Sequence, residues 1–324
     1  MSDNTTTPII CDLFGVELET NIYFHTTLAV LAIILAILTI IFNAIFLLVM
    51  FRFIQRLSVP DMLYAMLAVS DILTGILVMP SFSAFWIHAL LSHSDCMLVN
   101  FVNVSVHILG VVSVSVIALI TMDVFVSIVY PFLYPLYFTK RFVYIMFGLI
   151  WTLAIICPLA LVIISIKDWY VYQNISGGIV IAVVLALFVM HLKLHHVLNN
   201  MRCQITHGNN EQKENLRAKR KASKLATSIL VTLLISFAPS LVYFLLTAIE
   251  GNTVFTSSYF FQATGVWFFL NPLLDPFVYY FRLKRVRKNI LKMFGSRIIP
   301  ANMSTFTEST FNVRYPANYK STNK

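Results

Sequence analysis

Hydrophobic residues along this chain gather into seven long runs, while polar residues lie between them. The runs cover roughly 25–51, 61–86, 97–130, 142–166, 175–201, 222–249 and 257–281. An α-helix needs about 20 apolar residues to cross the hydrocarbon core of a bilayer, and it satisfies its own backbone hydrogen bonds there. A transmembrane β-barrel would instead show polarity that alternates at short intervals. The pattern therefore predicts an all-α membrane protein built as a seven-transmembrane helix bundle.

Composition agrees with a membrane protein, and the charges indicate its orientation. Hydrophobic residues make up 59% of the 324 residues and charged residues only 11%, which is too little charge for the surface of a soluble domain.

All Lys and Arg residues except Lys167 fall on the side of loops 52–60, 131–141 and 202–221 and of the tail after Phe281. Positively charged loops face the cytoplasm. We therefore expect a multi-pass plasma-membrane protein with an extracellular N-terminus. The net charge of +9 then faces anionic lipid, and no nucleic-acid partner is indicated.

This topology divides the chain into four parts. Residues 1–24 form an extracellular segment, and residues 25–281 form the seven-helix domain. Residues 282–295 have apolar positions at helical spacing, which is typical of a short amphipathic eighth helix on the inner leaflet. Residues 296–324 are polar, and we expect them to form a disordered cytoplasmic tail.

Two kinds of residue on the expected outer side suggest modification. The sequons "NTT" at Asn4 and "NIS" at Asn174 both fall outside, where glycosylation occurs. Of the four cysteines, only Cys11 and Cys96 lie in oxidising surroundings. They are the candidate pair for a disulfide that ties the N-terminal segment to the third run.

A few polar side chains interrupt the runs, namely Asn43, Asp71, Ser113, Asp123, Asn271 and Asp275. Ionisable groups inside a bilayer are costly and face the bundle interior or a water-filled cavity. No Lys or Arg lies mid-run near Asp71 or Asp275, so each carboxyl is either protonated and hydrogen-bonded or paired with a bound cation. Oxygen ligands suit a hard ion, and no other cofactor is indicated. A structural polar network that bonds the helices together is the alternative.

The order of these residues resembles the rhodopsin-like (class A) G-protein-coupled receptors over nearly the whole chain. "NPLLDPFVYY" is similar to the seventh-helix signature of that family, with Asp275 in place of the usual Asn before Pro276, and then Tyr279. "LAVSD" is similar to the second-helix motif that ends in the sodium-site aspartate, here Asp71. "GLIWTLAIICPLAL" and "ISFAPSLVYF", which contains Pro239, are similar to the fourth-helix and sixth-helix motifs.

The resemblance implies one pocket for water or sodium between the helices, lined by Asn43, Asp71, Ser113, Asn271 and Asp275. Two carboxylates in one pocket repel, so either a sodium ion sits between Asp71 and Asp275 or one of them is protonated. The resemblance also implies that Pro276 kinks the seventh helix and that Tyr279 swings inward on activation.

The activation switches depart from the family pattern. The third-helix motif is Asp/Glu-Arg-Tyr in the family and Asp123-Val124-Phe125 here. Phe237 takes the place of the usual sixth-helix Trp, and Lys219 stands where many relatives have an acid. Without the arginine and the acid, the usual inactive-state ion pair cannot form. We therefore expect coupling to a G protein to be weak, unusual or constitutive. A receptor with little G-protein coupling is the alternative.

The outer half also differs from most relatives. The second outer loop, roughly 167–174, is short and lacks a cysteine, so the usual disulfide from the third helix cannot form. The fifth run has no proline. With the "DPxxY" variant, these features are similar to the melanocortin, lipid and nucleoside receptors.

The resemblance narrows the ligand by elimination. The last run, 257–281, has no lysine for retinal, and residues 98–122 have no acid for an amine. We expect an extracellular peptide, a lipid or another non-amine small molecule. The expected outer side is acidic and would steer a basic ligand, because Lys167 there is opposed by Asp3, Asp12, Glu17, Glu19, Asp95, Asp168 and Glu250. The family implies a heterotrimeric G protein and an arrestin as inner partners, the latter on a phosphorylated tail.

The competing function is a seven-helix ion channel or transporter that uses Asp71, Asp123 and Asp275 as an ion path. Inverted repeats would support a transporter, and the two halves show none. We expect no enzyme activity, because the sequence has no HExxH, no nucleophile elbow and no phosphate-binding glycine loop.

Overall fold

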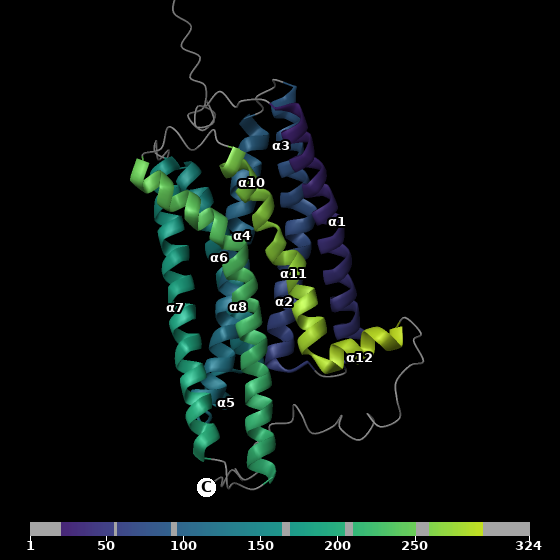
Figure 1. The fold of residues 1–324 in the computed structure, drawn as a ribbon, viewed down its shortest axis with the longest axis vertical. Coiled ribbons are helices and arrows are strands. Elements are labelled where there is room, and N and C mark those ends of the chain that lie inside the picture. The colour runs from purple at the N-terminus through teal and green to yellow at the C-terminus, as the bar shows by residue number, and fades with distance from the viewer. Residues whose placement is uncertain are drawn as a thin grey trace, which may run out of the picture.

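Long helices run side by side along one axis and form a bundle (Figure 1). The structure is a computed structural model that describes residues 21–54, 57–91, 96–163, 169–204, 210–250 and 259–293. In these ranges no strand is present. The helical elements are α1 (Ile22–Phe53), α2 (Val59–Leu73), the π-helical turn η2 (Thr74–Val78), α3 (Met79–Leu90), α4 (Cys96–Val129), α5 (Tyr134–Tyr137), α6 (Lys140–Ile163), α7 (Trp169–Gln204), α8 (Asn210–Glu250), α10 (Tyr259–Phe268), α11 (Leu270–Arg282) and α12 (Lys284–Met293).

In the described residues the helical elements form seven spans, which correspond to the seven apolar runs. Among the described residues, six helical segments are long and apolar enough to cross a membrane, and each overlaps one of the first six runs. The second of them is continuous through α2, η2 and α3. The seventh run forms α10 and α11, which follow one another end to end. The predicted seven-transmembrane helix bundle is confirmed.

The last span differs from the single helix that its apolar run suggested, because it breaks at Phe269. The Phe269 amide donates to the Val266 carbonyl at 3.1 Å, which tightens the chain at the end of α10. Pro272 then falls in the first turn of α11, where a missing N–H costs no intrahelical bond. The Phe269 ring packs edge-on against Phe82 at a centroid distance of 5.2 Å. Tertiary packing and the proline together place the break.

Burial shows which spans are central. The most apolar 18-residue window of the α2–α3 span is 72% buried and that of α4 is 56% buried, whereas the window of α6 is only 17% buried. Exposed residues of the outer spans are apolar, such as Leu153 on α6 and Val189 on α7. In water this surface would be a liability, and in a bilayer it faces hydrocarbon. The acidic and amide side chains described below lie on α1, α2, α4 and α11.

The structure adds detail to the sequence predictions at the start of α7 and after α11. The loop expected at 167–174 is largely helical, because α7 begins at Trp169 and no proline or glycine interrupts its first two turns. After α11 the chain turns at Leu283, and α12 leads sideways away from the bundle axis (Figure 1). Val286 of α12 is buried, and Arg285 forms an ion pair with Asp61 at the start of α2 at 2.6 Å. The expected amphipathic helix is thus joined to one end of the bundle. We call this end the inner end and the opposite end the outer end, after the orientation that the sequence predicts.

Candidate functional site

The core of the bundle contains two acidic side chains from different helices. Asp71 on α2 and Asp275 on α11 are both 0% exposed. They interact electrostatically with each other, and none of their four carboxylate oxygens has a hydrogen-bond partner among the described residues. Buried polar groups are normally paired, and an unpaired buried charge costs several kcal/mol. The pair therefore requires a proton, water or a cation to offset this cost.

Asn43 on α1 supports the helix that carries Asp275. Its Nδ2 atom donates to the Thr39 carbonyl at 3.1 Å and to the Pro272 carbonyl at 2.9 Å. The Pro272 carbonyl lacks its regular helical donor because Pro276, four residues later, has no N–H. Asn43 supplies the missing donor, and it thereby fixes the kinked turn of α11 next to the acid pair.

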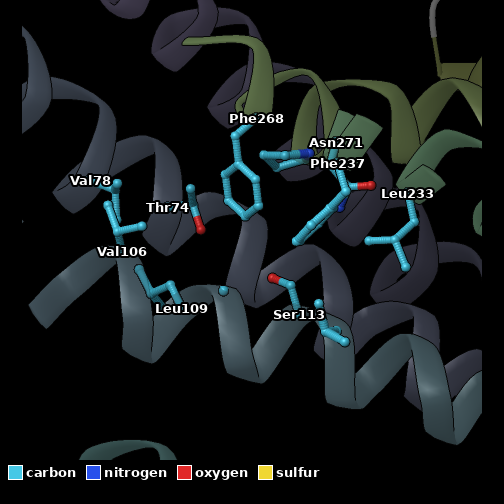
Figure 2. A pocket seen from close by; sticks show the side chains of 12 residues that line it. Thr74, Val78, Val106, Leu109, Ser113, Leu233, Phe237, Phe268 and Asn271 are labelled. Carbon is cyan, nitrogen blue, oxygen red and sulfur yellow. The ribbon is translucent and has the colours of Figure 1, made fainter. Parts of the chain in front are cut away.

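A small cavity lies between η2, α4, α8 and the α10–α11 junction (Figure 2). Its volume of about 10 Å³ is roughly the space that one water molecule needs. In Figure 2 the hydroxyls of Thr74 and Ser113 point into the space between the helices. Ser113 also lies 3.4 Å from the Ser70 hydroxyl. The buried Asn271 Oδ1 atom has no partner in the described part of the chain, so the cavity offers unsatisfied oxygen next to apolar walls.

The structure therefore divides the expected pocket residues into two groups. Ser113 and Asn271 line the cavity. Asn43, Asp71 and Asp275 are buried in the core but do not line it. Ser113 is partly buried and the other four are buried, but no single cavity contains all five, so the one shared pocket that the resemblance implied stays a prediction.

Tyr279 completes the polar core below the acids. It is 0% exposed, and its hydroxyl has no partner among the described residues. Its ring packs on Phe46 and Tyr64 at centroid distances of 4.6 and 5.4 Å, and its hydroxyl interacts electrostatically with both carboxylates. Tyr279 is thus an interior residue in this structure, and its inward movement on activation stays a prediction.

The inner end of the bundle is held by apolar contacts. Asp123 on α4 accepts a hydrogen bond from the Tyr134 hydroxyl of α5 at 2.7 Å. Val124 is buried, and we call the group around it the inner apolar cluster, which consists of Val124, Ile128, Leu194, Leu198 and Ala226 from α4, α7 and α8. Phe125 packs at its edge, with Lys193 Nζ 5.9 Å from the ring centroid. At position 124, where the family usually has an arginine, the side chain therefore packs among apolar residues.

A hydrogen bond from α10 compensates for a second proline, which lies within α8. Pro239 in α8 removes the N–H that would bond the Ile235 carbonyl. The Trp267 Nε1–H of α10 donates to that carbonyl at 3.0 Å. One residue further along, Phe268 packs edge-on against Phe237 at 4.8 Å, and both rings line the cavity. The sequence signal for this bond is the proline four residues after the carbonyl, because such a carbonyl needs a donor from outside its own helix.

The family model of the 7 transmembrane receptor (rhodopsin family) matches residues 42–279. The chain belongs to the rhodopsin family of seven-transmembrane receptors. The matched region starts one residue before Asn43 and ends on Tyr279, so it encloses the whole polar core. A search of curated proteins finds none that matches the chain.

Membership of the rhodopsin family makes this chain a multi-pass membrane receptor, with an extracellular ligand and a G protein as its general classes of partner. The family is one of receptors and not of enzymes. The similarity to the melanocortin, lipid and nucleoside subgroup stays a prediction.

The outer end of this rhodopsin-family bundle is filled by aromatic side chains. Trp86 on α3 is buried and stacks on His25 at 4.9 Å, and Phe82 and Phe85 meet its edges. These rings pack against one another between the helices, whereas Trp267 is 45% exposed.

Four of the expected modification residues stay untested. Asn4 and Cys11 lie outside the described residues. Cys96 begins α4 and Asn174 lies in α7, but their side chains are also outside the described part. The Cys11–Cys96 disulfide and the two glycosylation sites therefore remain predictions.

Proposed function

We propose that this receptor lies in the plasma membrane with its N-terminus outside and binds an extracellular peptide, lipid or other non-amine small molecule. Ligand binding is passed to a heterotrimeric G protein or to an arrestin on the inner side. The observation that carries this proposal is the fully buried pair Asp71 and Asp275, whose oxygens lack partners in the described chain. Such costly groups persist in a membrane core at functional sites.

A sodium ion fits this pair by its chemistry. Four unpartnered carboxylate oxygens, with the Asn271 oxygen nearby on α11, form the all-oxygen donor set that a hard cation prefers. Asp71 and Asp275 are the residues that would hold the ion, which supplies the positive charge that relieves their repulsion. Asn43 keeps the kinked α11 turn in place, so the distance between the two carboxyls depends on how α1, α2 and α11 are packed.

The inner apolar cluster and the Trp267–Ile235 bond both hold α8 against the rest of the bundle. The cluster joins α8 to α4 and α7 at the inner end, and the bond joins α8 to α10 at the Pro239 kink. An outward movement of α8 must break both. With Val124 in place of the family's arginine, buried apolar contacts instead of an ion pair hold α8 in its inactive position. We therefore expect G-protein coupling to be weak, or the receptor to signal without ligand.

The ligand class rests on the residues at the outer half. Residues 98–122 of the third run supply no acid for an amine. The acidic outer side favours a basic peptide. The Ser- and Thr-rich tail supports arrestin as a partner after phosphorylation.

A ligand panel on cells tests the proposal. The full chain and an Asp275→Ala variant are expressed at equal surface level, and several G-protein outputs, arrestin recruitment and membrane current are recorded. We expect a peptide or lipid to give a G-protein or arrestin response in the full chain that the variant alters. A ligand-gated current with neither response would favour the channel alternative and would overturn the receptor mechanism.

A further inference from the structure

The helices α8 and α11 are in contact (Figure 1). Residues from both helices line a groove on the surface of the bundle. Its volume is about 280 Å³, and it is lined by Ser228, Thr232, Leu274, Phe277, Val278 and Phe281. None of these residues lines the central cavity. The groove is therefore a separate site on the side of the helices that carries no residue of the polar core.

The surroundings of the groove face hydrocarbon. Val231 and Ile235 on α8 are 45% and 49% exposed, and Phe281 on α11 is 69% exposed. In a membrane-spanning bundle these side chains contact lipid, so whatever occupies the groove must be soluble in the bilayer. The hydroxyls of Ser228 and Thr232 donate to carbonyls of their own helix, each at 2.8 Å. Because those protons are already used, the walls are suited to a hydrocarbon chain.

The inner end of the groove is basic. Lys221, Lys224, Ser228 and Thr232 follow one another at spacings of three or four residues, so they share one face of α8. Lys221 and Lys224 are exposed, and they continue the groove face beyond its hydroxyl residues. On the other wall, Phe281 is followed closely by the exposed Lys284 at the start of α12. Three lysines thus stand where the apolar walls end.

We propose that this groove binds one anionic phospholipid. One acyl chain lies between α8 and α11, and the phosphate contacts Lys224 together with Lys221 and Lys284. Apolar walls with one basic end match the two parts of such a lipid, and a zwitterionic lipid would gain less from the lysines. The leaflet is the inner one under the proposed orientation. A lipid that occupies this groove contacts α8 and α11 at once, so it opposes their separation.

Native mass spectrometry of the full-length receptor in detergent tests the site. Phosphatidylglycerol or phosphatidylcholine is titrated onto the delipidated protein, and bound lipid is counted. We expect the wild type to retain one phosphatidylglycerol at concentrations where phosphatidylcholine is lost. Lys224→Glu should weaken this binding by at least about fivefold, because one basic residue near a membrane surface contributes about that factor. Lys140→Glu, an exposed lysine at the start of α6, is the matched control and should bind like the wild type.

A second variant tests the apolar walls. Thr232→Trp fills the groove and leaves all three lysines in place, so it should lose the retained lipid. Ser228→Phe, at the partly exposed rim, serves the same purpose if Thr232→Trp does not fold. Equal losses in Lys224→Glu and Lys140→Glu, equal retention of phosphatidylcholine, or full binding by the filled variants would each overturn the proposal. The experiment needs no ligand, sodium or coupling, so its failure is distinct from failure of the proposed receptor mechanism.

Discussion

The Trp267–Ile235 hydrogen bond gives a sharp prediction, because only the proline at 239 makes it necessary. Trp267→Phe removes the Nε1–H donor and leaves an aromatic ring in the same place. The Ile235 carbonyl then lacks both its regular helical donor and the indole that lies 3.0 Å away. The variant therefore leaves the Ile235 carbonyl oxygen without a hydrogen-bond donor inside the membrane span, which should lower the free energy of unfolding.

The expected magnitude follows from membrane hydrogen bonds. Side-chain bonds between transmembrane helices contribute on average about 0.6 kcal/mol and at most about 1.7 kcal/mol. The Ile235 carbonyl lies beside a proline and has no substitute donor from its own helix, so we expect a loss of about 1 to 1.7 kcal/mol. Trp267 is 45% exposed, so the smaller phenyl ring should add little to this value.

A double-mutant cycle isolates the bond. In Pro239→Ala the restored amide of residue 239 can donate to the Ile235 carbonyl, so the added change Trp267→Phe should cost less than about 0.5 kcal/mol. Unfolding of the full-length receptor by SDS in mixed micelles, followed by circular dichroism, gives the four free energies of unfolding. If Trp267→Phe costs the same with Pro239 and with alanine, the proposed role of Trp267 at the kink is refuted.

Three further predictions concern other contacts. Asn43→Ala leaves the Pro272 carbonyl unpaired and should lower the free energy of unfolding by about 1 to 3 kcal/mol, measured in the same SDS titration; no change would contradict the bridging role. A Cβ atom at Gly265 would lie 2.4 Å from Phe82 Cζ, so Gly265→Ala should cost about 1 to 3 kcal/mol, and the added change Phe82→Leu should recover part of it. Val124→Arg places a charge among apolar side chains, at a cost of up to about 3 kcal/mol, and should raise basal G-protein activation in cells; wild-type stability with an unchanged basal signal would argue against the closing role of the inner apolar cluster.

The helical architecture could be predicted from the sequence because a bilayer permits few kinds of spanning backbone structure. Seven apolar runs in a bilayer leave helices as the simplest spanning element, and the buried positions of Asp71 and Asp275 followed from the cost of ionisable groups in hydrocarbon. The amphipathic stretch after Phe281 likewise became α12. In each case the signal lies within a short stretch of sequence.

The remaining features depend on contacts between distant residues. The break at Phe269 lies inside a continuous apolar run, and its position depends on packing against Phe82 from another span. The residues that fill the place of the missing third-helix arginine come from α7 and α8, far along the chain from Val124. Trp267 bonds a carbonyl 32 residues away. Such partners become visible only once the helices are placed beside one another.

The central claim is that Asp71 and Asp275 form one buried acidic site that takes up sodium. The most direct measurement is the thermal unfolding of the purified full-length receptor in sodium chloride and in potassium chloride at equal ionic strength. Sodium should stabilise the wild type selectively, by about 2.7 kcal/mol at a hundredfold excess over the dissociation constant, while Asp71→Asn and Asp275→Asn lose that difference. Equal unfolding temperatures of the wild type in the two salts, or an undiminished sodium response in both variants, would contradict the account.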